Sequence, residues 1–198
     1  MRNSQDTRDL IISKALPIFN RKGYRSTSLS DITNATGMTK GAIYGNFENK
    51  DALALASFDR AMARITDELT LSIKSGKDAP EKLKAILDYY EKYIDNPPID
   101  GGCPIINTSV EADDEYPLLR TKAIRMIALI RGSLIKIINR GIIERQIKPK
   151  TNVEQFASVF YSSIQGALII SRVEGHQDNY QLIKQSLTSQ INDITFIK

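Results

Sequence analysis

Few side chains with the chemistry of catalysis or metal binding occur in this chain of 198 residues. It has one cysteine, Cys103, which excludes an internal disulfide, and one histidine, His176. This leaves no dense group of His and Cys side chains of the kind that holds zinc. His176 lies in the polar segment 174–179, where a surface loop residue is expected rather than a catalytic base. Because a Walker-type loop and a Gly-x-Gly-x-x-Gly motif are also missing, the sequence predicts neither an enzyme nor a metal or cofactor site.

Long apolar runs are absent as well. No local apolar run is longer than that of Met126–Ile130, which has five residues, whereas a membrane span needs roughly 18. The start of the sequence, MRNSQDTRD, is polar and lacks the apolar core of a signal peptide. We therefore expect a cytoplasmic protein with no membrane-spanning segment. The length suits one or two small domains, on a prior of roughly 100–200 residues for each.

The net charge is concentrated in one part of the chain. Residues 1–50 hold eight Lys and Arg against four Asp and Glu, and residues 51–198 hold nineteen of each. The whole formal net charge of +4 therefore lies in the first quarter. A small basic segment attached to a neutral body is typical of nucleic-acid binding, although a solvated surface can carry the same excess. Asp113, Asp114 and Glu115 form an acidic cluster, which we interpret as a solvated turn.

Strand signals are scarce, and helical periodicity dominates instead. The sequence predicts an all-α fold of about nine helices, in which short helices come first and long ones follow. The first has Asp6 or Thr7 as its N-cap and ends at Gly23, with a kink at Pro17. A capping box, Ser28–Asp31, opens the second helix. The remaining expected helices are a short one capped by Thr39, a run capped by Asn49 to about Ser75, Ala79–Ile94, a short one within Ile99–Glu115, Pro117–Ile143, Asn152–Val173 and Asn179–Ile197.

The segment from Ser28 to Lys50 has the pattern of a helix-turn-helix. Such a motif needs a small residue where its helices cross, a turn residue able to take a positive φ, and apolar anchors behind the second helix. Ala35, Gly37, and Met38 with Ile43 occupy these places. The second helix carries small or hydrogen-bonding side chains on its outer surface, as a helix in the major groove must. These residues are Thr39, Lys40, Gly41, Ala42, Tyr44 and Asn46.

Over residues 7–60 the sequence resembles the TetR family of bacterial transcriptional regulators. The resemblance rests on the segments FNRKGY (19–24), TSLSDI (27–32), GMTKGAIY (37–44) and FENKDAL (47–53). A later block, GGCPIINTSVEADD (101–114), resembles a loop and helix found in one subgroup. The rest of the C-terminal half resembles the family in architecture alone.

The resemblance implies DNA contacts for several residues, and each has a structural alternative. Tyr44 and Lys50 match residues with which the family binds phosphate, whereas Tyr44 could also be a half-buried packing residue. Lys40 is expected to touch a base or phosphate, or else to be a solvated lysine. Ser28 and Ser30 either cap and solvate the second helix or donate to phosphate at its positive N-terminus. Gly41 and Ala42 either allow close approach to base edges or reflect no selection for size.

The resemblance also implies two domains and a homodimer. Residues 1–50 are expected to bind DNA, residues 49–75 to form a linking helix, and residues 51–198 to bind ligand and dimerise. The last two helices would form a four-helix interface with those of a second chain, and packing in the monomer core is the alternative for the same residues. The apolar candidates are Phe156, Phe160, Ile164, Leu168, Leu182, Leu187 and Ile191, with Ser163, Gly166 and Ala167 allowing close approach.

A small-molecule inducer is the third implication. The family's cavity would be walled by the helices expected at 79–94, 117–143 and 152–173, whose apolar character suits an apolar or aromatic ligand. Its candidate lining residues are Tyr89, Tyr93, Met126, Phe160 and Gln165. Tyr89 and Tyr93 share a helical face, which equally fits a buried core. Some members of the subgroup use a cysteine in the 101–114 block as a redox or electrophile sensor, so Cys103 is either a sensor or a small buried hydrophobe.

We therefore predict a ligand-responsive transcriptional repressor with double-stranded DNA, an inducer and a second copy of the chain as partners. A helical metabolite-binding or adaptor protein that no longer binds DNA is the main alternative, because residues 39–46 are compatible with both. An enzyme on a helical bundle is a weaker alternative, since no constellation of titratable groups supports it.

Overall fold

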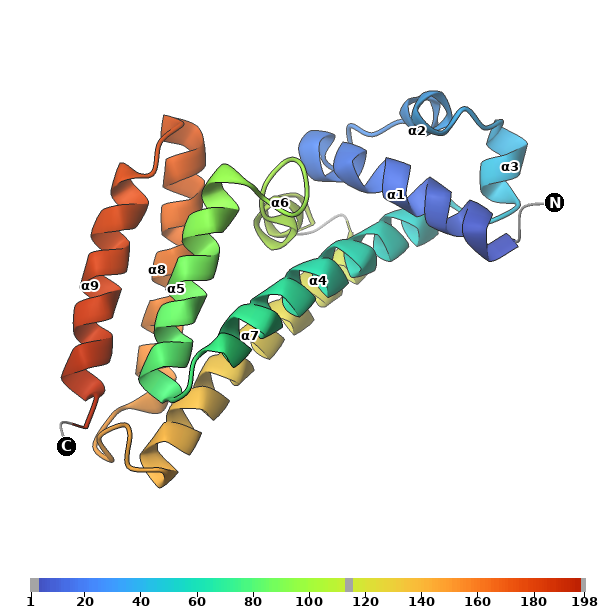
Figure 1. Ribbon diagram of the computed structural model, residues 1–198. Coiled ribbons are helices and arrows are strands. Elements are labelled where there is room, and N and C mark those ends of the chain that lie inside the picture. Colours follow the sequence, from blue (N-terminus) through green and yellow to red (C-terminus); the bar gives the residue numbers. More distant parts are fainter. Residues whose placement is uncertain (1–3, 113–115, 197–198) are drawn as a thin grey trace. The chain divides into compact units, whose positions relative to one another are not determined.

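The computed structural model describes residues 4–112 and 116–196. Within this part of the chain it contains nine helices and no strand, which confirms the predicted all-α fold (Figure 1). The helices are α1 (Ser4–Lys22), α2 (Leu29–Thr36), α3 (Lys40–Tyr44), α4 (Lys50–Ser75), α5 (Ala79–Asp95), α6 (Pro104–Glu111), α7 (Pro117–Ile143), α8 (Val153–Glu174) and α9 (Asp178–Ile194). The acidic cluster Asp113–Glu115 and the expected helix end at Ile197 lie outside the described residues.

The short helices begin where their capping residues predict. The Ser28 hydroxyl accepts a hydrogen bond from the Asp31 N–H at 3.1 Å, and the Asp31 carboxylate accepts one from the Ser28 N–H at 2.9 Å. Hydrogen bonds from the Lys22 ammonium and from Ser28 lower the pKa of Asp31 to about 2, so this cap stays charged at neutral pH. Gly37 ends α2 in the left-handed region with φ at +69°, a conformation that glycine adopts without strain. Thr39 caps α3, because its hydroxyl accepts from the Ala42 N–H at 3.2 Å.

Two expected helix ends are wrong. α1 begins at Ser4, so Asp6 lies in its first turn and Thr7 lies within it instead of capping it. α9 stops at Ile194, because Thr195 is extended and pairs with Ile147 in an isolated antiparallel bridge. The partner of Thr195 is almost fifty residues away, so a local pattern carries no signal for this end. α1 continues through Pro17 as one helix, and the expected kink there stays a prediction.

The chain divides into two compact units. The first comprises Met1–Ile65 and Pro97–Arg125, and the second comprises Thr66–Asn96 and Met126–Lys198. The division falls inside α4 and inside α7 and adds the segment around α6 to the N-terminal residues. The boundary expected at residue 50 follows function rather than compactness and stays a prediction.

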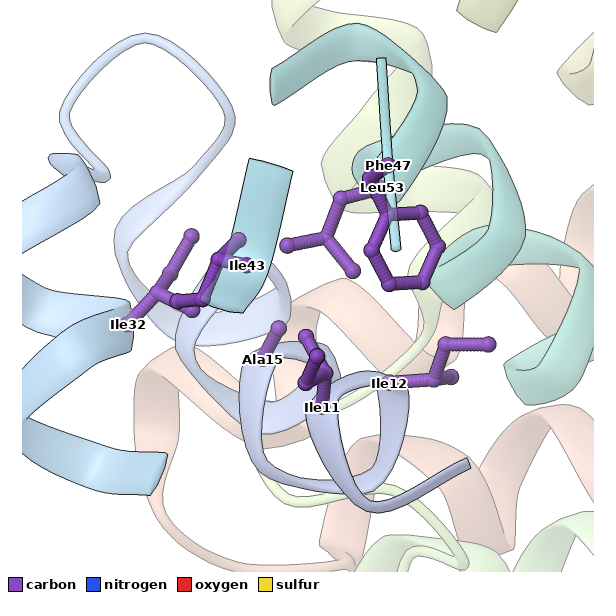
Figure 2. Close-up of a cluster of buried hydrophobic side chains, with 7 residues drawn as sticks. All are labelled: Ile11, Ile12, Ala15, Ile32, Ile43, Phe47 and Leu53. Atoms are coloured by element: carbon purple, nitrogen blue, oxygen red, sulfur yellow. The ribbon is translucent and has the colours of Figure 1, made fainter. Parts of the chain in front are cut away.

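A tight apolar cluster forms the core of the first unit around α3. Figure 2 shows its seven side chains, which come from α1, α2, α3, the turn after α3, and α4. Each is at most 6% exposed, and Phe19, Leu29, Met38 and Ala56 pack against them. The cluster consists of Ile11, Ile12, Ala15, Ile32, Ile43, Phe47 and Leu53. It therefore joins the helix-turn-helix to the first and fourth helices, and it includes the predicted anchor Ile43.

The second unit is built on α5, α8 and α9, which pack against one another (Figure 1). By length and composition alone, α8 could cross a membrane, because an 18-residue window within it has a mean hydropathy of 1.2. Seven of its residues, Phe160 and Ile164 among them, are buried in this unit, which accounts for much of that apolar character. On α9, Tyr180 is fully buried, and its hydroxyl donates to the Leu87 carbonyl at 2.7 Å.

Replacing Tyr180 by phenylalanine should change stability in a pH-dependent way. Burial raises the pKa of Tyr180 above its ordinary value of 10.0, so the folded state favours the neutral phenol. The neutral phenol therefore contributes fully to the free energy of unfolding below pH 10. As pH rises above 10, this contribution is lost by up to about 1.4 kcal/mol per pH unit. Tyr180→Phe should lose about 0.5–1.5 kcal/mol at pH 7 and show a shallower decline above pH 10 in urea unfolding. At pH 7, Tyr44→Phe, which removes an exposed hydroxyl, should stay within about 0.5 kcal/mol of wild type.

Candidate functional site

The outer surface of α3 carries the side chains predicted to contact DNA. Lys40, Gly41, Ala42 and Tyr44 are all exposed, and Tyr44 is 49% exposed. Ile43, which lies between them in the sequence, is buried in the cluster of Figure 2. The burial of Ile43 fixes which face of this short helix points outward. That face presents an ammonium, a phenol and two small residues, with no acidic side chain.

Gly41 has no packing reason to be a glycine in the described part of the chain. A Cβ atom built at this position would come no nearer than 3.9 Å to another atom outside its immediate neighbours, the Thr39 hydroxyl oxygen. A larger side chain would therefore fit this chain but would project from the exposed face. This favours the interpretation that close approach of another molecule requires the small residue, and it leaves that interpretation a prediction.

Four polar side chains of the motif differ in the hydrogen-bonding groups that they still offer to a phosphate. The Thr39 hydroxyl accepts a bond from the Ala42 N–H, and a hydroxyl that accepts retains its own hydrogen. The Asn46 amide uses one N–H on the Ala42 carbonyl at 2.9 Å. Ser28, in contrast, donates its hydroxyl hydrogen to Asp31 at 2.9 Å, so this hydrogen is already used within the capping box. Ser30 is exposed beside it. The DNA-contact roles of these four residues stay predictions.

Part of the positive charge of the first 50 residues is used inside the first unit. The guanidinium of Arg8 lies 4.0 Å from the centre of the Phe47 ring and donates to the Asn46 carbonyl. Lys22 pairs with Asp31 at 2.6 Å. Lys40 is exposed on α3. The charge excess is therefore divided between holding the motif together and lying at its surface.

Lys50 has a structural role that its sequence position did not reveal. Its ammonium donates to the carbonyls of Tyr24 and Thr27, both at 2.8 Å, and lies 4.3 Å from the centre of the Tyr24 ring. These bonds fix the segment that leads from α1 into α2. An ammonium has three donors, so one remains for a phosphate. The partners are 26 and 23 residues away in the sequence, which is why local patterns did not indicate them.

Side chains of α6 hold the same segment from another direction. The Glu111 carboxylate accepts hydrogen bonds from the N–H groups of Tyr24 and Arg25, both at 2.5 Å. The Asn107 amide donates to the Asn20 carbonyl at 2.9 Å and to the Gly101 carbonyl at 2.9 Å. These residues were not predicted as functional. The resemblance of the 101–114 block to a subgroup was the one signal that could have pointed to them.

Gly23 fits this contact closely. Its φ is +82°, and a Cβ built on it would lie 2.7 Å from a Glu111 carboxylate oxygen. Any larger residue would therefore be strained in its backbone and would push the carboxylate away. The end of α1 is thus shaped for the approach of Glu111 as well as for the turn toward α2.

Cys103 lies at the N-terminus of α6, as the loop-like sequence before it indicates. It is half-buried, and its carbonyl accepts from the Asn107 N–H at 3.0 Å. It belongs to the first unit, whereas the other five predicted ligand residues belong to the second. Both interpretations, a sensor thiol and a small packing residue, stay open.

A pocket with a volume of about 460 Å³, which includes its open mouth, lies within the second unit. Its walls come from the second half of α4 and from α5, α7 and α8, so three of its four helices are those predicted. Phe160 is the predicted residue that lines it, together with Tyr90 and Tyr161. Tyr89, Tyr93, Met126 and Gln165 are not among its lining residues in the described structure, and their ligand contacts stay predictions. The full lining is Thr66, Leu69, Thr70, Ile73, Ile86, Tyr90, Leu129, Ile130, Ser133, Leu134, Phe160, Tyr161 and Ile164.

The tyrosines of α5 form a compact aromatic group. The rings of Tyr89, Tyr90 and Tyr93 lie 5.2–6.0 Å apart between centres, and all three are buried. This burial supports the alternative of a buried core for Tyr89 and Tyr93, while their ligand contacts stay predictions. The neighbouring Tyr90, which was not among the predicted ligand residues, is the tyrosine of this group that lines the pocket.

Comparison with known proteins decides the family. The family model described as "Bacterial regulatory proteins, tetR family" matches residues 11–57, and the one described as "Tetracyclin repressor-like, C-terminal domain" matches residues 79–187. The chain belongs to the TetR family. This confirms the resemblance found in the sequence and extends it beyond residue 60.

Solved structures of other members match the whole chain. A TetR-family regulator from Cytophaga hutchinsonii is 35% identical to this chain, with a TM-score of 0.92. The match covers 100% of this chain and 99% of the regulator. A TetR regulator from Chloroflexus aurantiacus is 32% identical with a TM-score of 0.95, and covers 100% of both chains. The HTH-type transcriptional repressor DhaR of Mycobacterium sp. (strain GP1) is 24% identical over 176 residues, which cover 86% of this chain and 85% of DhaR. This TetR-family protein is a DNA-binding transcriptional regulator and not an enzyme.

Replacing Lys50 and Lys40 by alanine, one at a time, should distinguish the structural role of Lys50 from the surface role of Lys40. Lys50→Ala removes two charge-assisted hydrogen bonds and should lower the free energy of unfolding by about 1–3 kcal/mol. Lys40→Ala removes an exposed ammonium and should leave stability within about 0.5 kcal/mol of wild type. Both should weaken binding to duplex DNA, and each lost phosphate contact should lower the salt slope by about 0.9. A Lys50→Ala protein with wild-type stability would show that its two carbonyl contacts are not important.

Proposed function

We propose that this regulator is a repressor that binds a pseudo-palindromic operator as a homodimer and leaves it when a small apolar molecule binds. The observation that carries the proposal is the exposed face of α3, where Lys40 and Tyr44 flank Gly41 and Ala42 over a buried Ile43. Small residues between hydrogen-bonding ones let a helix approach base edges while its donors reach phosphates. One copy offers one such helix, so two copies are needed to bind half-sites about 34–36 Å apart.

An apolar face that is exposed in the described structure supports dimerisation through α8 and α9. On α8, Val159, Ile170 and Val173 are 43%, 41% and 82% exposed, and on α9 Leu182 is 65% exposed. The three α8 positions follow a helical repeat that also includes the half-buried Gly166. A Cβ on Gly166 would meet nothing within 4 Å in the described structure, so a small residue there suits the approach of another backbone.

The predicted interface residues divide between this face and the monomer core. Leu182 is exposed and stays a candidate, and Phe156, Ser163 and Gly166 are half-buried. Phe160, Ile164, Ala167, Leu168, Leu187 and Ile191 are buried within the chain itself. For these six the alternative of core packing is the better supported, and the exposed stripe on α8 replaces them in the proposed interface.

The pocket of the second unit supports a ligand-responsive regulator. Its lining is mostly aliphatic and aromatic, and its polar groups are hydroxyls, those of Thr66, Thr70, Ser133, Tyr90 and Tyr161. Among the residues that the structure describes, no Lys, Arg, Asp or Glu lines it, so it suits an uncharged apolar ligand better than a phosphorylated one. To act as an inducer, the ligand must bind the DNA-incompetent state more tightly, since equal affinity for both states shifts nothing.

The dimer is tested with a charge placed in the exposed stripe. Val173→Glu should convert a dimer into a monomer in sedimentation at micromolar concentration and weaken operator binding, because a dimer must otherwise bury the carboxylate. Val110→Glu is the matched control, since Val110 is 81% exposed on α6 in the first unit. It should leave both properties unchanged. A wild-type chain that sediments as a monomer would contradict the proposal.

The ligand route is tested on DNA fragments selected from the source genome. Apolar compounds that release the wild-type protein should fail with Ser133→Phe, which narrows the pocket, and should still release Thr121→Phe on the exposed part of α7. Quinones, hypochlorite and aldehydes tested on wild type and Cys103→Ser separate the electrophile route. Release by these reagents that requires Cys103 would favour the thiol over the pocket, and selection of no fragments would favour the adaptor alternative.

A further inference from the structure

A second pocket lies wholly within the first unit, apart from the ligand pocket proposed above. It has an empty volume of about 500 Å³, which includes its open mouth, and its walls come from α1, α4, α6 and the start of α7. Most of the wall is apolar, and four aromatic rings, those of Phe19, Tyr24, Phe58 and Tyr116, contribute to it. A pocket of this kind favours a small, flat, mostly apolar molecule.

One polar group in this pocket lacks a partner. Ser57 on α4 is 2% exposed, and its hydroxyl has no hydrogen-bond partner among the residues that the structure describes. A buried hydroxyl without a partner is costly, since it has lost its hydrogen bonds to water. Ser57 lines the pocket, so a bound molecule with one oxygen could supply the missing bond.

The neighbouring polar side chains are already engaged. Both oxygens of Glu111 accept N–H bonds from the segment after α1, and the Asn20 amide donates to the carbonyls of Asp100 and Gly102 at 2.9 and 2.8 Å. Asn107 donates to Asn20 at 2.9 Å. Among the described polar residues of the lining, Ser57 has a buried hydroxyl without a partner, which suits it to orient a ligand. The negative charge of Glu111 in the wall disfavours an anion.

We propose that this pocket binds a small uncharged aromatic molecule whose hydroxyl or carbonyl oxygen hydrogen-bonds to Ser57. The ring would lie among Phe19, Phe58 and the alanines Ala54 and Ala61 of α4. The site goes beyond the proposed function, because it lies in the unit that carries α3 and does not depend on the pocket of the second unit. Its wall includes Gly23 and Tyr24, so occupancy stabilises the arrangement in which Glu111 and Lys50 hold that segment.

Methyl NMR of the full chain tests the site without DNA, with phenol as the probe and toluene as its apolar counterpart. Phenol should produce saturable shifts in the methyl signals of Leu16, Ala54 and Leu119, which line this pocket. The methyls of Ile86 and Ile164, which line the pocket of the second unit, report on that pocket separately. Shifts confined to the second set would overturn the proposal while leaving the proposed function intact.

Two variants test the role assigned to Ser57 and to the cavity. In Ser57→Ala the ratio of the affinities for phenol and toluene should fall about tenfold, because one buried hydrogen bond is lost. Ala61→Phe should abolish the shifts by filling the pocket. Ala54→Val adds less volume than Ala61→Phe and should weaken binding. It provides the same test if the Ala61→Phe protein does not fold. An unchanged preference in Ser57→Ala would overturn the proposal, because Ser57 would then have no contact with the bound oxygen.

Discussion

A helix of five residues cannot hold itself together in water, because forming its first turn fixes several residues for very few hydrogen bonds. α3 exists because Ile43 is buried among Ile11, Ile32 and Leu53 and because Thr39 caps its first turn. The same burial determines that Lys40 and Tyr44 point outward. The candidate DNA-binding surface therefore depends on a contact at its back, and the identity of the exposed residues matters only once Ile43 is in place.

The connection between α1 and α2 shows how irregular backbone is stabilised beside such a motif. Backbone N–H and C=O groups that leave a helix need other partners. Glu111 accepts from the N–H groups of Tyr24 and Arg25, while Lys50 donates to the carbonyls of Tyr24 and Thr27. An anion from α6 and a cation from α4 thus bind opposite polar groups of one short segment. The orientation at which α2 leaves α1 is set by these two side chains as well as by apolar packing.

Local patterns in the sequence predicted the features that depend on near neighbours. The capping box Ser28–Asp31, the left-handed Gly37 and the bounds of α7 agree with the structure, because each depends on residues within one or two turns. The end of α9 and the contacts of Lys50 depend on partners more than twenty residues away, and no periodicity encodes them. The family resemblance supplied the predicted role of α3, which residue patterns alone left open between a DNA-binding helix and a solvated one.

Helical periodicity is least informative where a helix has two apolar faces. α8 buries Phe160 and Ile164 against its own chain and exposes Val159 and Val173 on another side. In the sequence these sets merge into one apolar segment, which is why α8 also resembles a membrane span by composition. A helix buried on one face alone would carry polar residues on the other. In the proposed homodimer, closed symmetry lets the same face on another copy cover this second apolar face.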